Sequence, residues 1–240
     1  HAEALVRWQH PVHGTLRPDE FIPLAEQSGN IGMITHWVLH KAISDCGAWN
    51  AAGLDLTIAV NLSALDLFDA KLPAYISGLL RDANLSPSKL VLEITESAVM
   101  KDPLYASKVL RDLKDLGVSL SIDDYGTGYS SLAHLKRLPV DELKIDKSFV
   151  THLRNSAPQD LLILRSTIEL GHNMGLKVIA EGVEDAEAWR ILKEMGCDMA
   201  QGYYVSPPLP GAEFQDWFKR FAVARTLLFG TSSVPGYTSM

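Results

Sequence analysis

Two adjacent aspartates, Asp123 and Asp124, follow an apolar, strand-like stretch in the segment SLSIDDYGTGYSSL. Carboxylates side by side repel each other, and burial at the end of a strand raises the free energy of keeping both ionised. Bound cations would neutralise this repulsion. The pair therefore indicates a site for positive charge, and other strands should supply further ligands.

Each of the other strand-like segments also carries an ionisable or amide side chain among β-branched and leucine neighbours. In chain order these are Glu3, Asn61 in AVNLSA, Glu93 in LVLEITES, Lys144 in DELKID, Glu181 in VIAEGVE and Gln201 in AQGYYV. A single carboxylate of this kind is as often a salt-bridge partner or a cap, but a series at matching strand ends is not explained in that way. Carboxylate and amide oxygens suit Mg²⁺ or Mn²⁺.

Two such cations about 3.5–4 Å apart are a recurring device for phosphoester hydrolysis, because they generate hydroxide and stabilise the attacking and leaving oxygens. One of the adjacent aspartates would bridge the cations while its neighbour holds the second. Lys144 would add positive charge near the nucleophile or the phosphate. The polar series thus indicates metal-dependent phosphoester chemistry.

Strand and helix patterns alternate along the chain, which predicts βαβ units and a mainly parallel sheet. Strands are expected at residues 2–8, 55–61, 90–95, 118–123, 140–146, 176–180 and 200–205. Helices are expected at residues 18–27, 31–52, 73–83, 103–116, 130–136, 158–174, 186–195 and 211–224. A doubly wound sheet remains open, but the fold we favour is an α/β TIM-type (β/α)8 barrel, with chemistry at the carboxyl ends of its strands. The count closes if the first strand precedes the chain, which begins in mid-pattern at HAEALVRW.

The composition limits the partners and the compartment. The chain has 240 residues, 47% of them hydrophobic, and a net charge of −7, so non-specific DNA binding is disfavoured. Its two cysteines form no disulfide framework, which fits a reducing compartment. The GTGYSS loop lacks the third glycine of a dinucleotide-binding turn, and His36 and His40 lack the context of a zinc site.

The ordered motifs resemble the EAL-domain family of cyclic di-GMP-specific phosphodiesterases. The name-giving tripeptide stands at residues 3–5, and RPDEFIPLAEQSG, VNLSA, LEITES, DDYGTGYSSL, PVDELKIDKSFV, VIAEGVE and GCDMAQGYYVSPPLP follow in family order. The resemblance implies a modified TIM barrel at residues 1–224, incomplete at its N-terminus, with a flexible tail at residues 225–240. Tyr125 replaces the usual phenylalanine, and the family's upstream Tyr-Gln-Pro-like strand is missing.

The resemblance implies hydrolysis of cyclic di-GMP to pGpG with two Mg²⁺ or Mn²⁺ ions. It places Glu3, Asn61, Glu93 and Asp123 on one metal, and Asp123, Asp124 and Glu181 on the other. It makes Glu181 and Lys144 catalytic together with Glu3 and Asp123, and assigns Arg7, Leu5, Gln201 and Asp124 to substrate contact. Glu96 would anchor the loop at residues 126–131, with Glu184 in a supporting position.

The resemblance also implies a homodimer, a cytoplasmic location, fusion to upstream sensory or GGDEF domains, and a role in bacterial signalling over biofilm and motility. Two other functions stay open. A receptor module would bind cyclic di-GMP without cleaving it, although a receptor has no need of two metals. A different metal-dependent barrel enzyme, such as one that stabilises an enolate, would ignore cyclic dinucleotides.

Overall fold

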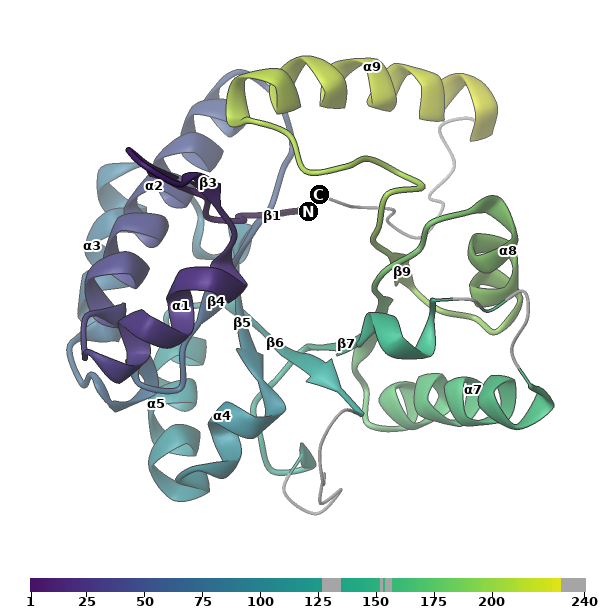
Figure 1. Cartoon of the computed structure of the whole chain (residues 1–240), viewed down its shortest axis with the longest axis horizontal. Helices are drawn as coiled ribbons and strands as arrows, with labels where there is room; N and C mark the ends of the chain where they lie inside the picture. Colours follow the sequence, from purple (N-terminus) through teal and green to yellow (C-terminus); the bar gives the residue numbers. More distant parts are fainter. Residues whose placement is uncertain (127–134, 152, 154–156, 230–240) are drawn as a thin grey trace.

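A computed structural model describes residues 1–126, 135–151, 153 and 157–229 of the chain. Its centre is a parallel sheet that curls into a half-barrel (Figure 1). The seven strands, in spatial order, are β1 (Ala2–Glu3), β4 (Ile58–Leu62), β5 (Leu90–Thr95), β6 (Ser119–Tyr125), β7 (Glu142–Ile145), β8 (Lys177–Ala180) and β9 (Met199–Ala200). All neighbouring pairs in this sheet are parallel, as the alternating pattern predicts.

Helices surround the sheet on its outer side (Figure 1). They are α1 (Pro18–Gln27), α2 (Ile31–Ala51), α3 (Leu72–Asp82), α4 (Glu96–Met100), α5 (Pro103–Asp115), α7 (Pro158–Asn173), α8 (Ala186–Glu194) and α9 (Gly211–Phe229), with 3-10 turns η1 (Asp66–Phe68), η2 (Pro87–Lys89) and η3 (Lys147–Phe149). Side-chain hydrogen bonds cap the first turns of two of these helices. At α5 the side chain of Asp102 accepts from the Tyr105 backbone N–H at 3.1 Å, and at α8 the side chain of Asp185 accepts from the Ala188 backbone N–H at 2.8 Å. No helix in the described ranges is long and apolar enough to cross a membrane.

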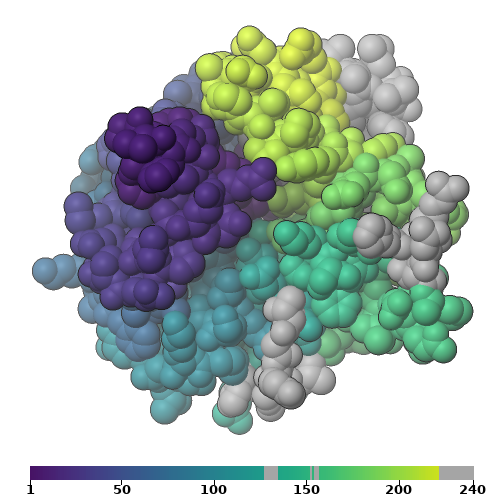
Figure 2. All heavy atoms as spheres, in the orientation of Figure 1, coloured from purple at the N-terminus to yellow at the C-terminus, as the bar shows by residue number. Residues whose placement is uncertain are grey.

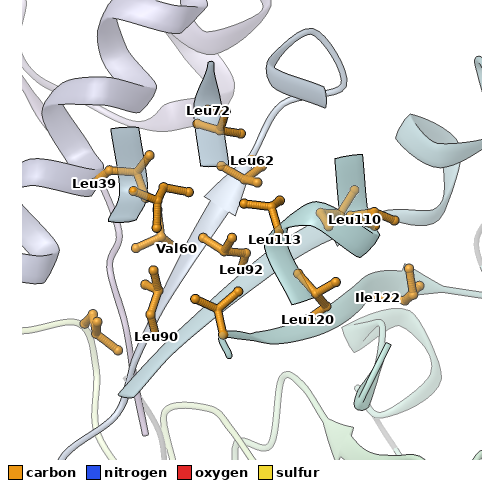
Figure 3. Close-up of a cluster of buried hydrophobic side chains, with 14 of the residues drawn as sticks. Leu39, Val60, Leu62, Leu72, Leu90, Leu92, Leu110, Leu113, Leu120 and Ile122 are labelled. Carbon is orange, nitrogen blue, oxygen red and sulfur yellow. The ribbon is translucent and has the colours of Figure 1, made fainter. Parts of the chain in front are cut away.

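The period-two alternation of the strands separates an apolar face from a polar one. Leucine, valine and isoleucine side chains of β4, β5 and β6 pack outward against α2, α3 and α5 (Figure 3). A smaller apolar cluster forms where β7, β8 and β9 meet α7 and α8. The alternate residues Glu93, Ser121 and Lys144 are buried but belong to neither cluster, so they face the inside of the half-barrel.

The predicted first strand is wrong in extent. It ends at Glu3, and Trp8–His10 forms β2, which pairs antiparallel with β3 (Gly14–Leu16) in a separate hairpin. Pro11 has no N–H for pairing, and Gly14 takes a left-handed backbone with φ of 72°, so the chain turns there. The EAL segment is therefore a short strand followed by a loop.

Other boundaries also differ from the prediction; β4, for example, begins at Ile58 instead of residue 55. β9 ends at Ala200, because Gly202, at φ of 156°, brings its backbone against Val183 so closely that a Cβ would lie 2.2 Å from the carbonyl oxygen. β6 continues through both aspartates to Tyr125. α9 runs to Phe229, beyond the predicted end of this helix at residue 224. The predicted helix at 130–136 falls largely on residues outside the described ranges, as do residues 230–240.

Candidate active site

Lys144 lies at the centre of a ring of carboxylates inside the half-barrel. Its Nζ atom is 2.7 Å from Glu181 Oε1, 2.9 Å from Glu93 Oε2 and 3.2 Å from Asp123 Oδ1. Glu3 Oε2 is 3.9 Å away. These acids come from or directly follow β1, β5, β6 and β8, so the parallel topology gathers residues far apart in sequence, as the strand-end pattern predicts.

The charge in this ring is unbalanced. The side chains of Lys144 and Glu93 are fully buried, and that of Asp123 is 11% exposed. Burial lowers the pKa of Lys144, but the surrounding carboxylates outweigh it and hold that pKa well above its ordinary value. The ammonium therefore stays charged. Four carboxylates around one ammonium still leave an excess of negative charge in a region of low dielectric.

Protons take up part of this excess when no other cation is present. Burial raises the pKa of Glu181 to about 7, with Lys144 opposing the shift and Asp123 adding to it. Burial also raises the pKa of Glu93 well above its ordinary value, again against the pull of Lys144. Two carboxyl groups of the ring thus hold protons more tightly than free glutamates, which is characteristic of functional sites.

Glu3, on the edge strand β1, is fixed between two amides, one from the neighbouring strand β4 and one that follows the opposite edge strand β9. Asn61 Nδ2 donates to Glu3 Oε1 at 2.7 Å, and Gln201 Nε2 donates to Glu3 Oε2 at 2.6 Å. Gln201 follows β9, so this bond links the first and last strands, and Figure 2 shows the purple N-terminal segments beside the yellow-green C-terminal ones. The predicted residues Glu3, Asn61 and Gln201 are therefore brought together.

The adjacent aspartates adopt an unusual backbone geometry. Asp124 has φ of 55°, in the left-handed region, and its backbone N–H donates to Asp123 Oδ1 at 2.9 Å. Burial raises the pKa of Asp124, with Asp123 and Asp146 adding to the shift. Left-handed non-glycine residues concentrate at functional sites, where the surrounding structure enforces them. Here the geometry turns two consecutive carboxylates toward one region.

The donor set fits hard divalent cations. Carboxylate oxygens of Asp123, Asp124 and Glu181 all lie within 4.8 Å of one another. Among the described residues, Glu93 Oε1 is buried without a hydrogen-bond partner, which is costly unless a cation or water binds there. Turning the Asn61 amide would present its oxygen beside Glu3 and Glu93. Oxygen-only ligands of this kind select Mg²⁺ or Mn²⁺ over softer metals.

Four predicted residues lie away from the ring. Arg7 is exposed and its Nη1 donates to the Val6 carbonyl at 2.8 Å. Leu5 is 37% exposed and lines a cavity of about 470 Å³ that Asn61 also borders. Glu96 is buried at the start of α4, and one of its oxygens has no hydrogen-bond partner among the described residues. Glu184 is exposed, and most of the loop that Glu96 was expected to anchor lies outside the described residues.

Sequence reasoning missed three polar residues at or beside the cavity that Asn61 lines, namely Thr35, Ser63 and Asp66. Thr35 and Ser63 line the cavity with Asn61, and both hydrogen-bond to the buried Asp66. The only available signal was the polar run after Asn61 in NLSALD, which also fits an ordinary solvated turn.

Comparisons with known proteins identify the family of the chain. The family model described as EAL domain matches residues 1–208. The bifunctional diguanylate cyclase/cyclic di-GMP phosphodiesterase MucR of Pseudomonas aeruginosa is 43% identical over 212 residues, covering 88% of this chain and 31% of MucR. The cyclic di-GMP phosphodiesterase NbdA of the same organism is 44% identical over 220 residues, covering 91% of this chain and 28% of NbdA. The chain thus spans about a third or less of these relatives.

A solved structure of the PaMucR phosphodiesterase in complex with c-di-GMP superposes with a TM-score of 0.84 at 43% identity. The alignment covers 88% of this chain and 86% of that one. Family model, relatives and structure together confirm the resemblance seen in the motifs. The chain belongs to the EAL domain family.

Proposed function

We propose that this domain is a metal-dependent phosphodiesterase that hydrolyses cyclic di-GMP to linear pGpG with two Mg²⁺ or Mn²⁺ ions. The observation that carries the proposal is the ring of four carboxylates around the buried Lys144, with further oxygen ligands at its edges. Relatives named as cyclic di-GMP phosphodiesterases, at 43% and 44% identity, support the substrate.

Bound at this ring, the cations would supply an activated water and stabilise charge on the phosphate oxygens. Glu3, Asn61, Glu93 and Asp123 would hold one of them, and Asp123, Asp124 and Glu181 the other. The shared ligand Asp123 lies between Glu93 and Glu181 around Lys144, which suits it to both groups.

Glu181 is the residue best placed to accept a proton from the attacking water. In the metal-free protein burial raises the pKa of this carboxyl group to about 7, and bound cations would lower it, so that the ionised, proton-accepting form prevails. The water oxygen joins phosphorus, one P–O ester bond breaks, and the released ribose oxygen takes up a proton. Lys144, 2.7 Å from Glu181, holds that carboxylate in place and stabilises its ionised form.

Residues around the ring would bind the substrate. Arg7, on the exposed loop after β1, can reach a phosphate with its guanidinium, for which paired charge-assisted bonds are the strong geometry. Leu5 would contact the dinucleotide from the cavity wall, with Gln201 and Asp124 nearer the ring. Glu96 and Glu184 would act in support. A homodimer, upstream sensory or GGDEF domains, and a cytoplasmic location complete the proposal.

The proposal is tested by product analysis. The purified chain is incubated with cyclic di-GMP in Mn²⁺, in Mg²⁺ and in EDTA, and the nucleotides are resolved by chromatography. Metal-dependent pGpG is expected. Intact substrate in all three conditions, together with tight binding of cyclic di-GMP, would refute hydrolysis and favour the receptor function. Intact substrate without binding would refute both.

A further inference from the structure

Asp66 is a buried acid that lies outside the carboxylate ring. It begins the η1 turn shortly after β4, and its residue is 5% exposed. Thr35 of α2, which is 4% exposed, donates from Oγ1 to Asp66 Oδ2 at 2.7 Å. The Ser63 backbone N–H donates to the same oxygen at 2.8 Å. Two short hydrogen bonds to one oxygen hold this buried carboxylate in a fixed position.

These bonds close the turn that follows β4 from both ends. The Asp66 backbone N–H donates back to the Ser63 carbonyl at 3.1 Å, and Ser63 Oγ accepts from the Leu65 N–H at 3.0 Å. Ser63 is the first residue after β4, so its backbone N–H is the first donor beyond the end of the strand. Asp66 satisfies that donor and joins it to α2 through Thr35.

The turn lies directly beside a predicted metal ligand. Only Leu62 separates Ser63 from Asn61, and the Leu62 side chain is fixed in the apolar core at 5% exposure. With Leu62 packed on one side and the Ser63 N–H held on the other, the peptide that carries Asn61 has little freedom. Asn61, Ser63 and Thr35 also line the same 470 Å³ cavity, so the turn forms part of its wall.

We propose that Asp66 is a positioning residue for the metal site, acting with Thr35 as a clamp that fixes the end of β4 and thereby the Asn61 side chain. The inference rests on the proposed function, because it assumes that Asn61 faces a bound cation. Residues that orient metal ligands commonly change metal affinity or activity about 10- to 100-fold when removed.

Both donors meet at a single oxygen, which gives the clamp a testable chemical signature. Asparagine presents one carbonyl oxygen of nearly the same geometry, so Asp66→Asn should keep both bonds, whereas Asp66→Ala loses both. Burial raises the pKa of Asp66 against the opposing hydrogen bonds from Thr35 and Ser63, and a neutral amide avoids this cost of burying a charge.

The experiment measures Mn²⁺ affinity by isothermal titration calorimetry on the whole chain, for wild type, Asp66→Ala, Asp66→Asn and Thr35→Val. Asp112→Ala serves as the control, because it removes one exposed acid from α5. We expect Asp66→Ala to bind Mn²⁺ about tenfold more weakly than wild type and Thr35→Val about threefold more weakly. Asp66→Asn and Asp112→Ala should bind Mn²⁺ with wild-type affinity. At saturating Mn²⁺ the kcat of Asp66→Ala should return toward wild type, which a general structural defect would not allow.

The clamp is refuted if wild type binds Mn²⁺ and Asp66→Ala binds it equally well, or if Asp66→Asn is as weak as Asp66→Ala. If Asp66→Ala does not fold, the Mn²⁺ affinities of Thr35→Val and Asp66→Asn are compared instead. The clamp is then refuted if Thr35→Val binds Mn²⁺ as tightly as Asp66→Asn. Failure of wild type itself to bind Mn²⁺ would instead overturn the proposed function, and with it the assumption on which the clamp rests.

Discussion

Replacing Lys144 by methionine should destabilise the metal-free protein strongly and in a pH-dependent way. The variant keeps the volume but leaves Glu3, Glu93, Asp123 and Glu181 around a neutral side chain. Removing one partner from a buried ion pair typically costs about 3–5 kcal/mol, because the remaining charge is uncompensated. We expect a loss of about that size at pH 8 in EDTA.

The pH dependence follows from the direction of the pKa shifts. The pKa values of Glu93 and Glu181 are already raised in the folded protein, and removal of the ammonium raises them further. A carboxyl group whose pKa is higher in the folded state favours folding below its unfolded pKa, and this advantage is lost as the pH rises through the folded value. The deficit of Lys144→Met should therefore shrink at pH 5, and Mn²⁺ should reduce it at pH 8.

Urea unfolding followed by circular dichroism, at pH 8 and pH 5, with EDTA or Mn²⁺, measures these differences. Lys41→Met is the matched control, since Lys41 pairs with Asp45 on α2 with 60% of its side chain exposed and should contribute under about 1 kcal/mol. Equal stability of Lys144→Met and Lys41→Met at pH 8 would show that the ring does not depend on the lysine. A deficit unchanged by pH and by Mn²⁺ would refute the charge argument.

Three further predictions concern other residues. Asp123→Asn should lower hydrolysis at least about 100-fold in a product assay while circular dichroism shows a folded chain; near-normal turnover would contradict its shared role. Glu142 is buried, one of its oxygens has no partner within the part of the chain that the structure describes, and burial raises its pKa, so its ionisation opposes folding as the pH rises. Glu142→Gln should be more stable than wild type at pH 8 and equal to it at pH 4 by urea unfolding, and a less stable variant at pH 8 would refute this reading. Burial raises the pKa of Cys46 to about 11 and of Cys197 to about 12, so both thiols should resist Ellman's reagent at pH 8 until urea unfolds the chain, whereas fast reaction in the native protein would be inconsistent with this packing.

The sequence predicted the sheet and most of the ring because both follow from local patterns. Alternating strand residues such as Glu93 and Lys144 face the side opposite their apolar neighbours, and parallel strands carry those residues to one end. The hydrogen bond between Glu3 and Gln201 was predictable only in outline, since it depends on how far the sheet curls.

Other features depend on tertiary contacts that no short-range pattern contains. The hairpin at Trp8–His10 was missed because EALVRW reads as one continuous strand. Asp66 was missed because its partner Thr35 stands 31 residues away on α2, and an aspartate in a loop is usually solvated. Lys144 was expected beside the nucleophile or phosphate, but its contacts with four acids also make it the charge on which the ring depends.

The most direct test of the central claim is the number of Mn²⁺ ions that the ring binds. Equilibrium dialysis of the metal-free chain at pH 8 should give two ions per wild-type chain, and substitution of Asp123, the ligand placed between both groups, should lower that number. Wild-type binding of no Mn²⁺, or binding unchanged in Asp123→Asn, would contradict the assignment of the carboxylate ring as a metal centre.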